Sequence, residues 1–268
     1  MNSPEKEKTE RGASPWGLEL LWVLYRLLGL RALHVGARAV GLCVWLFSPT
    51  VRRRAPRPAK VLHFTCSLAD KLVVMAEGAH LPRVSLRPSP DADRFVADVA
   101  AKRGVFVLSS HVGTIEVLAA LPGNETIFHA WMEFTRTSVF NAFYLRHAKR
   151  PRVRIHPISA FGPETVFFAG DALDRGECLV MAGDRGFGRR MRVPFGPGTT
   201  ELPAGAFRFA HVLEHPVYFV SCVATGDGAY ETVVRRLAAD TPAGLAAQYA
   251  AALWEVSRRY PDQVFQWN

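Results

Sequence analysis

The chain has 268 residues, of which 49% are hydrophobic, and 33 Lys and Arg against 24 Asp and Glu give a net charge of +9. This length allows one large domain with a real core, or less readily two small ones. The positive charge suits an anionic membrane, an acidic protein partner or nucleic acid. Nucleic-acid binding is disfavoured because the arginines do not interleave with aromatic residues. Four widely spaced cysteines without a Cys-x-x-Cys motif disfavour a disulfide framework and a zinc site, and fit a reducing compartment.

The N-terminal part changes character near residue 16. Residues 1–15 are polar and are expected to form a disordered tail, whereas residues 16–47 are strongly apolar. Four charged residues interrupt the apolar segment, so a simple spanning helix is disfavoured, and no signal-peptide cleavage site follows it. Tryptophans beside arginines favour helices that lie in the headgroup region, and the alternative is buried helices that cover the domain. The interrupting charges are Glu19, Arg26, Arg31 and Arg38.

A basic, proline-containing segment, Val51–Lys60, follows the apolar helices. Such a segment suits the negatively charged cytoplasmic leaflet of a membrane. We therefore expect a peripheral or monotopic protein on the cytoplasmic face of the inner membrane. The expected division is a tail at 1–15, membrane-associating helices with the basic linker at 16–60, and the main domain at 61–268.

Helical and strand patterns alternate through the main domain. Helices are expected at 62–77, 91–103, directly after His111, and at 138–147, 164–174, 204–213 and 243–260. Strands are expected at 105–108, 126–131, 152–158, 177–182, 216–223 and 230–235. This alternation predicts a layered α/β fold with a largely parallel sheet flanked by helices. Ligands of such sheets bind beyond the carboxyl ends of the strands, where His111 and Asp184 fall.

The segment Gly104–Glu116 carries the most specific chemical pattern. A buried strand runs into a turn that contains His111, Gly113 frees the backbone there, and a helix opens with Glu116 in its first turn. Within one helix the side chains at i and i+5 diverge, but this bend lets them converge. The pattern is typical of a general base and the carboxylate that orients it, although one His-x4-Glu match is also expected by chance.

A second polar segment, Gly183–Arg190, follows the strand expected at 177–182. Its three glycines and three arginines could hold a phosphate, or they could form a solvated turn. It is neither a P-loop nor a dinucleotide fingerprint, and no Gly-x-Ser-x-Gly elbow of a serine hydrolase occurs in the chain.

The order of these motifs resembles that of the late acyltransferases of lipid A biosynthesis, within the lysophospholipid acyltransferase superfamily. The matching order is an apolar N-terminal helix, His-x4-Glu, Gly-Asp-Arg, Phe-Gly, Pro-Ala-Gly, His-Pro-Val and a terminal Tyr-Pro-Asp-Gln-x-Phe. The resemblance covers about residues 16–268. It implies a glycerolipid acyltransferase-like fold and transfer of an acyl group from a thioester to a lipid.

The resemblance also implies roles for individual residues. His111 would be the general base and Glu116 the acid that orients it. Substrate-binding positions would be Gly113, Thr114, Asn141, Asp184, Arg185, Phe195, Gly196 and Gly205. Thr114 departs from the Asn that relatives usually carry, which leaves the acceptor's identity open. The oxyanion would be held by backbone N–H groups near Gly113 and by Arg185.

The implied reaction is direct transfer from acyl carrier protein or acyl-CoA to a hydroxyl, or less readily an amine, of a lipid or glycolipid. No metal or other cofactor is expected, because a thioester is already activated. Seven arginines are candidates for docking the acidic donor, namely Arg146, Arg150, Arg152, Arg154, Arg189, Arg190 and Arg192. The alternatives are a catalytically silent lipid-binding member of the same fold, and a hydrolase of acyl thioesters.

Overall fold

The computed structural model describes residues 15–77, 83–121, 125–132, 142–144, 146–147, 152–186, 188–226 and 228–265. The helices are α1 (Pro15–Phe47), α2 (Pro49–Arg54), α3 (Pro58–Glu77), α4 (Pro90–Ala100), α6 (Pro163–Asp174), α7 (Ala204–Val212) and α8 (Pro242–Arg259), with short 3₁₀ helices η1 (Ile115–Ala120), η2 (Ile158–Ala160) and η3 (Pro261–Gln263). The strands are β1 (Arg83–Leu86), β2 (Val105–Ser109), β3 (Phe128–Met132), β4 (Val153–Pro157), β5 (Cys178–Ala182), β6 (Arg190–Phe195), β7 (Gly198–Pro203), β8 (Val217–Gly226) and β9 (Ala229–Leu237).

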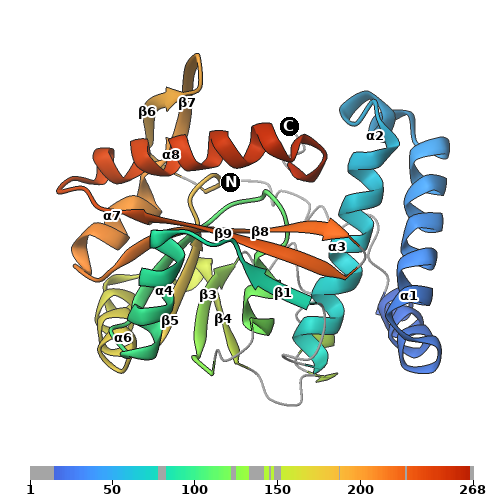
Figure 1. The fold of residues 1–268 in the computed structure, drawn as a ribbon, viewed down its shortest axis with the longest axis horizontal. Helices are drawn as coiled ribbons and strands as arrows, with labels where there is room; N and C mark the ends of the chain where they lie inside the picture. The colour runs from blue at the N-terminus through green and yellow to red at the C-terminus, as the bar shows by residue number, and fades with distance from the viewer. Residues whose placement is uncertain are drawn as a thin grey trace, which may run out of the picture.

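Seven strands form one twisted sheet in the order β1-β9-β8-β2-β5-β3-β4, and β6 and β7 form a separate hairpin (Figure 1). Every neighbouring pair in the large sheet is parallel except β8 and β9. Strand β2 lies near the middle and all five of its residues are buried, as expected for a strand covered on both faces. The predicted α/β class with a largely parallel sheet and flanking helices is confirmed.

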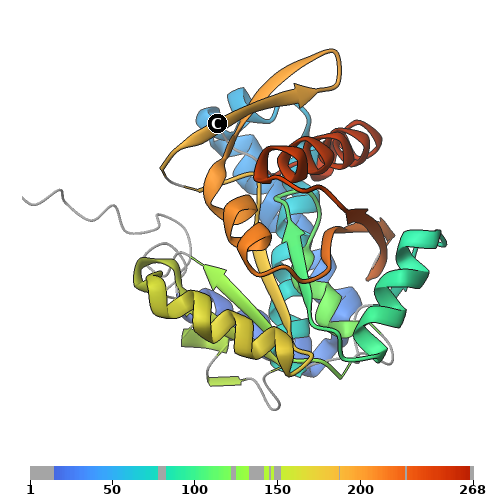
Figure 2. The ribbon, with the colours of Figure 1, turned by 90° about the vertical axis from the view of Figure 1, so that its left-hand side faces the viewer.

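Helices cover both faces of the sheet. Alternate residues of β2 face opposite ways, so Phe106 and Leu108 pack with α6, α7 and α8, whereas Val105 and Val107 pack with α4 and η1. Figures 1 and 2 show α8 on one side of the sheet and α4 on the other. This layering leaves the carboxyl ends of the central strands as the place for a site.

The helix starts follow ordinary capping chemistry. Ser89 caps α4 by accepting from the N–H of Ala92, and Thr241 caps α8 by accepting from the N–H of Gly244. In both helices a proline follows the cap, where its missing N–H costs nothing. These two helices lie on opposite faces of the sheet. On each face, a capping residue in the sequence therefore determines where one of the covering helices begins.

The N-terminal helices form a separate layer beside the sheet. Helix α3 lies between α1 and the sheet, and α1 and α3 share a small apolar core around Leu33 and Leu72 (Figure 1). Helix α1 is interrupted at Gly29, whose φ of 79° is a left-handed conformation that favours glycine. The described part of the chain contains one helix, Trp16–Phe47, that is long and apolar enough to cross a membrane.

Helix α1 exposes many large apolar side chains on its outer surface. Glu19 pairs with Arg146 and His147, and Arg26 pairs with Glu77 of α3, so these two charges have partners within the protein. Trp16 is 84% and Leu27 76% exposed. Also exposed are Leu20, Val23, Leu28, Val35, Val40, Leu46 and Phe47. A surface helix of a soluble protein normally exposes polar side chains instead.

Several local predictions need correction. The basic linker expected at 51–60 is largely helical, because α2 runs to Arg54 and α3 already begins at Pro58. Residues 190–203, for which no strands were predicted, form the β6–β7 hairpin, in which a tight turn at Gly196 joins two antiparallel strands. Strand β1 was not predicted. Half of the helix expected at 138–147 lies outside the described residues, and residues 142–144 and 146–147, which are described, are helical.

Candidate active site

The site is built where two parallel neighbours, β2 and β5, end. Ser109 of β2 pairs in register with Ala182 of β5, and His111 and Asp184 each lie two residues beyond that pair. The N–H of Gly183 donates to the carbonyl of Ser109 at 2.9 Å, which extends the pairing past the strand ends. Residues separated by 73 positions in the chain are therefore brought opposite one another by the sheet.

Asp184 holds His111 through both of its carboxylate oxygens. Oδ1 lies 2.9 Å from Nδ1 of the imidazole, and Oδ2 accepts from the backbone N–H of His111 at 2.8 Å. Because a carboxylate accepts hydrogen bonds, this contact places the imidazole proton on Nδ1 and leaves the lone pair on Nε2. The Asp184 side chain is fully buried while that of His111 is 37% exposed. The imidazole can therefore present Nε2 to a ligand while the Asp184 carboxylate stays shielded from water.

Glu116 occupies a different position from the one predicted. It lies in the first turn of η1 and forms an ion pair with Lys71 of α3. Burial opposes its ionisation, but the Lys71 ammonium outweighs that cost, so the pKa of the Glu116 carboxyl is lowered. The hydrogen bond to His111 that was expected from Glu116 comes from Asp184 instead. His111 is still near enough for its positive form to favour the Glu116 carboxylate.

The turn after His111 depends on Gly113. Its φ is 72°, and a Cβ atom at this position would collide with the carbonyl oxygen of Cys222 in β8. The N–H of Gly113 donates to the carbonyl of Gln263 at 2.9 Å, and that of Thr114 donates to the carbonyl of Cys222 at 2.7 Å. These backbone groups were expected to hold an oxyanion, but they are already used by the fold. That expectation is corrected.

Arg185 is linked to the backbone of His111 through Phe265. Its guanidinium donates to the carbonyl of Phe265 at 3.0 Å, and the N–H of Phe265 donates to the carbonyl of His111 at 2.8 Å. Val112 and Val264 form an isolated antiparallel bridge in the same place. The C-terminal segment thus acts as a short extra strand that links Arg185 to the backbone of the histidine.

Tyr249 of α8 contacts the backbone next to the His111–Asp184 pair. It was not among the residues predicted from the sequence. Its hydroxyl donates to the carbonyl of Ser109 at 2.8 Å, and its ring fills the space that a side chain on Gly183 would need. Burial, reinforced by the nearby Asp184 charge, raises the pKa of the Tyr249 hydroxyl well above its usual range. A tyrosine in the apolar pattern of α8 looks like ordinary core, so the sequence carries no signal for this role.

The other predicted substrate-binding residues are dispersed. The buried Thr114 hydroxyl donates to Oγ of Ser67 in α3 at 2.7 Å. Phe195 and Gly196 pack on Trp254 of α8, Phe195 with a ring-centroid distance of 5.1 Å. Gly205 lies in the first turn of α7 with open space around it. Asn141 lies outside the described residues. Of the predicted set, the contacts thus join Gly113, Asp184 and Arg185 to the surroundings of His111.

The predicted donor-docking arginines do not gather at one place. Arg189, Arg190 and Arg192 are exposed at and on the β6–β7 hairpin, which projects beyond α8 (Figure 2). Arg146 is engaged by Glu19 of α1, at 2.7 Å. Arg152 and Arg154 lie at the start of the edge strand β4, and Arg150 is outside the described residues.

A second titratable cluster lies at the other end of the sheet. His129 of β3 is fully buried, with Nε2 2.8 Å from Glu177 and Nδ1 2.9 Å from Nε2 of His156 in β4. Glu177 accepts, so His129 carries its proton on Nε2 and His156 donates to Nδ1. Trp131 stacks on His156 at 4.9 Å. Within the described ranges, no group of His, Cys, Asp and Glu side chains is arranged to bind a metal.

This histidine pair predicts a loss of stability in mild acid. Desolvation lowers the pKa of both His129 and His156 from the ordinary 6.5, so the unfolded chain binds protons more readily than the folded one below that pH. The free energy of unfolding should therefore fall as pH drops from 7.5 to 5, by up to about 1.4 kcal/mol per pH unit for each histidine. Denaturant unfolding at several pH values measures the slope.

The matched variant for this measurement is His156→Gln, whose amide can still donate to His129. It should show a shallower dependence of unfolding free energy on pH than the unchanged chain. Equal slopes for the two proteins would contradict the assignment of the effect to this pair.

Comparison with known proteins adds no family to these observations. No protein-family model matches the chain, and no curated protein matches its sequence.

Proposed function

We propose that the chain is a membrane-associated acyltransferase that moves a fatty acyl group from an acyl thioester to a hydroxyl of a lipid or glycolipid. The observation that carries the proposal is the His111–Asp184 pair, a half-exposed imidazole held through Nδ1 by a sealed carboxylate at the carboxyl ends of β2 and β5. We also propose that this α/β arrangement is the glycerolipid acyltransferase-like fold that the motif order implies.

In the proposed reaction, Nε2 of His111 takes the proton of the acceptor hydroxyl as its oxygen attacks the thioester carbonyl. Asp184 keeps the other proton on Nδ1 and stabilises the imidazolium that forms. The tetrahedral intermediate collapses to the ester, the carbon–sulfur bond breaks, and the imidazolium returns its proton to the thiolate. No covalent enzyme intermediate is needed, and such proton transfer is worth about 10²–10⁴-fold in rate.

Two further charged residues belong to the proposed site. The Arg185 guanidinium is the group we assign to the developing oxyanion, since one of its N–H groups donates to the Phe265 carbonyl and its other N–H groups could donate to substrate. The Glu116 carboxylate interacts electrostatically with His111, without a hydrogen bond to it. Its ion pair with Lys71 keeps it ionised, so it is unsuited to act as a second base.

The exposed apolar side chains of α1 support membrane association. Glu19 and Arg26 are paired within the protein, and many large apolar side chains lie on the outer surface of the helix. Arg52, Arg53 and Arg54 of α2 follow directly, as suits an anionic leaflet. We propose that α1 lies in the plane of the interface on the cytoplasmic side, with the acyl chain of the acceptor lipid reaching the site from that layer.

The exposed arginines of the β6–β7 hairpin support docking of an acidic donor. Acyl carrier proteins and coenzyme A are both anionic, and an exposed arginine arm would steer either one. Arg190 and Arg192 make contacts with Glu201 and Thr199 of the facing strand, which hold their side chains along the hairpin.

The experiment that tests the function follows the fate of the acyl group. The purified full chain is mixed with labelled acyl-CoA or acyl carrier protein and with vesicles of bacterial lipids, and the His111→Ala variant from the same preparation serves as the blank. We expect label in an ester of a lipid. Release of all label as free fatty acid would identify a thioesterase, and no reaction with any donor would identify a silent member of the fold.

Membrane binding makes a separate prediction about α1. Leu20→Glu/Leu27→Glu should weaken binding to anionic vesicles at least tenfold, because each leucine loses about 1.5–3 kcal/mol of burial in the membrane. Vesicle co-sedimentation measures the bound fraction. The control is Phe167→Glu/Val212→Glu, two exposed apolar residues on α6 and α7. An equal loss in the control would show that added negative charge, rather than the α1 face, is responsible.

A further inference from the structure

A pocket rich in arginine lies between α1 and the tip of the β8–β9 hairpin, away from the His111–Asp184 pair. Its volume is about 690 Å³. We call it the arginine pocket, and it is lined by Leu30, Arg31, His34, Val35, Arg38, Arg83 and Gly228. No carboxylate is among the described residues that line it. The pocket is held together at its base, where the N–H of Arg83 donates to the carbonyl of Gly228 at 2.7 Å.

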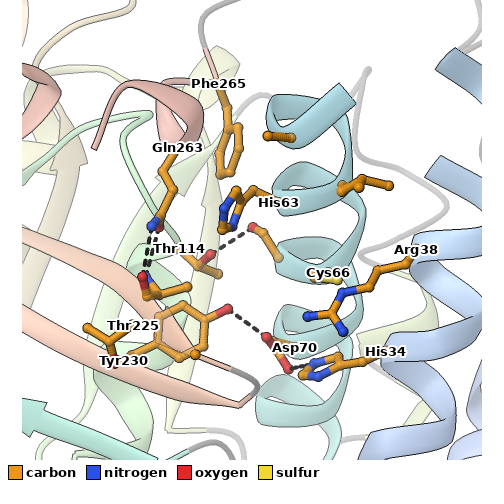
Figure 3. Close-up of a pocket in the computed structure, with 15 residues that line it drawn as sticks. His34, Arg38, His63, Cys66, Asp70, Thr114, Thr225, Tyr230, Gln263 and Phe265 are labelled. Atoms are coloured by element: carbon orange, nitrogen blue, oxygen red, sulfur yellow. Dashed lines mark hydrogen bonds and ion pairs between the residues drawn. The ribbon is translucent and has the colours of Figure 1, made fainter. Parts of the chain in front are cut away.

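A second pocket of about 420 Å³ adjoins the first and shares His34 and Arg38 with it. We call it the inner pocket. It lies between α3 and the ends of β8 and β9, and Figure 3 shows Arg38 and His34 reaching toward α3 from α1. Hydroxyl groups of Ser67, Thr114 and Tyr230 line it. Among its described lining residues, neither His111 nor Asp184 is found.

Asp70, the one carboxylate among the described residues that line the inner pocket, is bound on both of its oxygens. Asp70 accepts from the Tyr230 hydroxyl at 2.6 Å and lies 2.6 Å from Nε2 of His34 (Figure 3). This chain of contacts joins β9, α3 and α1, and so fixes the position of the arginine-bearing helix relative to the sheet. The buried Tyr230–Asp70–His34 contacts therefore determine how α1 is placed against the sheet, and with it the shape of both pockets.

The charge of the arginine pocket calls for an anion. Guanidinium groups stay protonated at any physiological pH, so a negative group between Arg31 and Arg83 would be favoured. Among the described residues, neither of these two arginines forms an ion pair with a carboxylate. Planar guanidinium forks match phosphate oxygens in pairs, and several such contacts in one pocket favour a dianion over a monoanion.

We propose that the arginine pocket binds the phosphate of an organic phosphate, with the hydroxyl-bearing part of that ligand directed toward the inner pocket. Val35, which lines the pocket, also belongs to the exposed apolar side chains of α1. A phosphate at this position could thus come from the headgroup of a membrane lipid or from a soluble ester. The inference concerns binding away from His111 and does not depend on acyl transfer.

The test is calorimetric titration of the purified full chain, at physiological salt and without thioester, with dihexanoyl phosphatidic acid and separately with inorganic phosphate. Arg31→Gln/Arg83→Gln should weaken binding at least tenfold. The control, Arg94→Gln/Arg208→Gln, removes two exposed arginines of α4 and α7 that do not line the pocket, and it should bind within about twofold of the unchanged chain, because charges at that distance are largely screened by salt. Arg31→Lys/Arg83→Lys keeps the charge and should recover part of the affinity.

The outcomes separate the possibilities. Tight binding of the phosphatidate with weak binding of inorganic phosphate supports a lipid headgroup, and equal binding supports a soluble phosphate. Absence of saturable binding of both probes overturns the proposal, as does equal weakening by the pocket and control variants. Thermal unfolding of each variant without ligand verifies that it is folded. A negative result here leaves acyl transfer by His111 untouched, since no thioester is present.

Discussion

Replacement of Asp184 by Asn is expected to slow acyl transfer by about 10²–10⁴-fold, the usual value of a positioned general base. Asn keeps the size of the side chain and can still accept from the backbone N–H of His111. Its amide group would face Nδ1 as a donor, however, and would force the imidazole proton onto Nε2. The base would then have no lone pair toward the acceptor, and the imidazolium would lose its counter-charge. Steady-state transfer rates of the variant and the unchanged chain measure the effect.

Glu116→Gln is the matched comparison for that variant, because both replace a carboxylate by an amide near the same histidine. Its effect on the rate should be clearly smaller, since Glu116 bonds Lys71 and reaches His111 only through space. Nitrogen NMR of the imidazole should show the changed tautomer in Asp184→Asn alone. A larger rate loss in Glu116→Gln than in Asp184→Asn would return the orienting role to the carboxylate in the His-x4-Glu motif.

The carboxylate that orients His111 is Asp184 rather than Glu116, and the sequence alone could not have predicted this. Both His111 and Asp184 could be placed after buried strands, because a run such as Val105–Leu108 is apolar and bounded by turn residues. That β2 and β5 are neighbours could not be read from the chain, since β3 and β4 intervene in sequence but lie on the far side of β5. Proximity in sequence therefore favoured Glu116, whereas the sheet register favours Asp184.

The oxyanion site was misplaced for a related reason. A glycine turn beside a base suggests free N–H groups, but whether they are free depends on which segments come to lie against them. Here Cys222 of β8 and Gln263 after α8 supply the carbonyls, from parts of the chain more than 100 residues away. The apolar N-terminal segment was predictable from composition alone. Its partners Glu77 and Arg146 were not, because ion pairs between distant exposed residues leave no pattern in the sequence.

Gly113→Ala should be the most damaging small substitution in the site. The left-handed φ of 72° costs a non-glycine residue about 1–2 kcal/mol, and the collision of its Cβ with the Cys222 carbonyl adds about 1–3 kcal/mol of overpacking. We therefore expect the free energy of unfolding to fall by about 2–5 kcal/mol. Denaturant unfolding measures the change directly.

The control is Gly170→Ala in α6, where the nearest atom to the new Cβ is Cδ2 of Leu213 at 4.0 Å. Alanine is favoured over glycine inside a helix by about 0.5–1 kcal/mol, so this variant should be slightly more stable than the unchanged chain. Opposite signs for the same chemical change would locate the cost in the backbone of the turn. Because that turn also carries His111, the folded fraction of Gly113→Ala should lose transfer activity as well. An unchanged unfolding free energy and rate would show that the loop can relax away from β8, and that the imidazole does not depend on it.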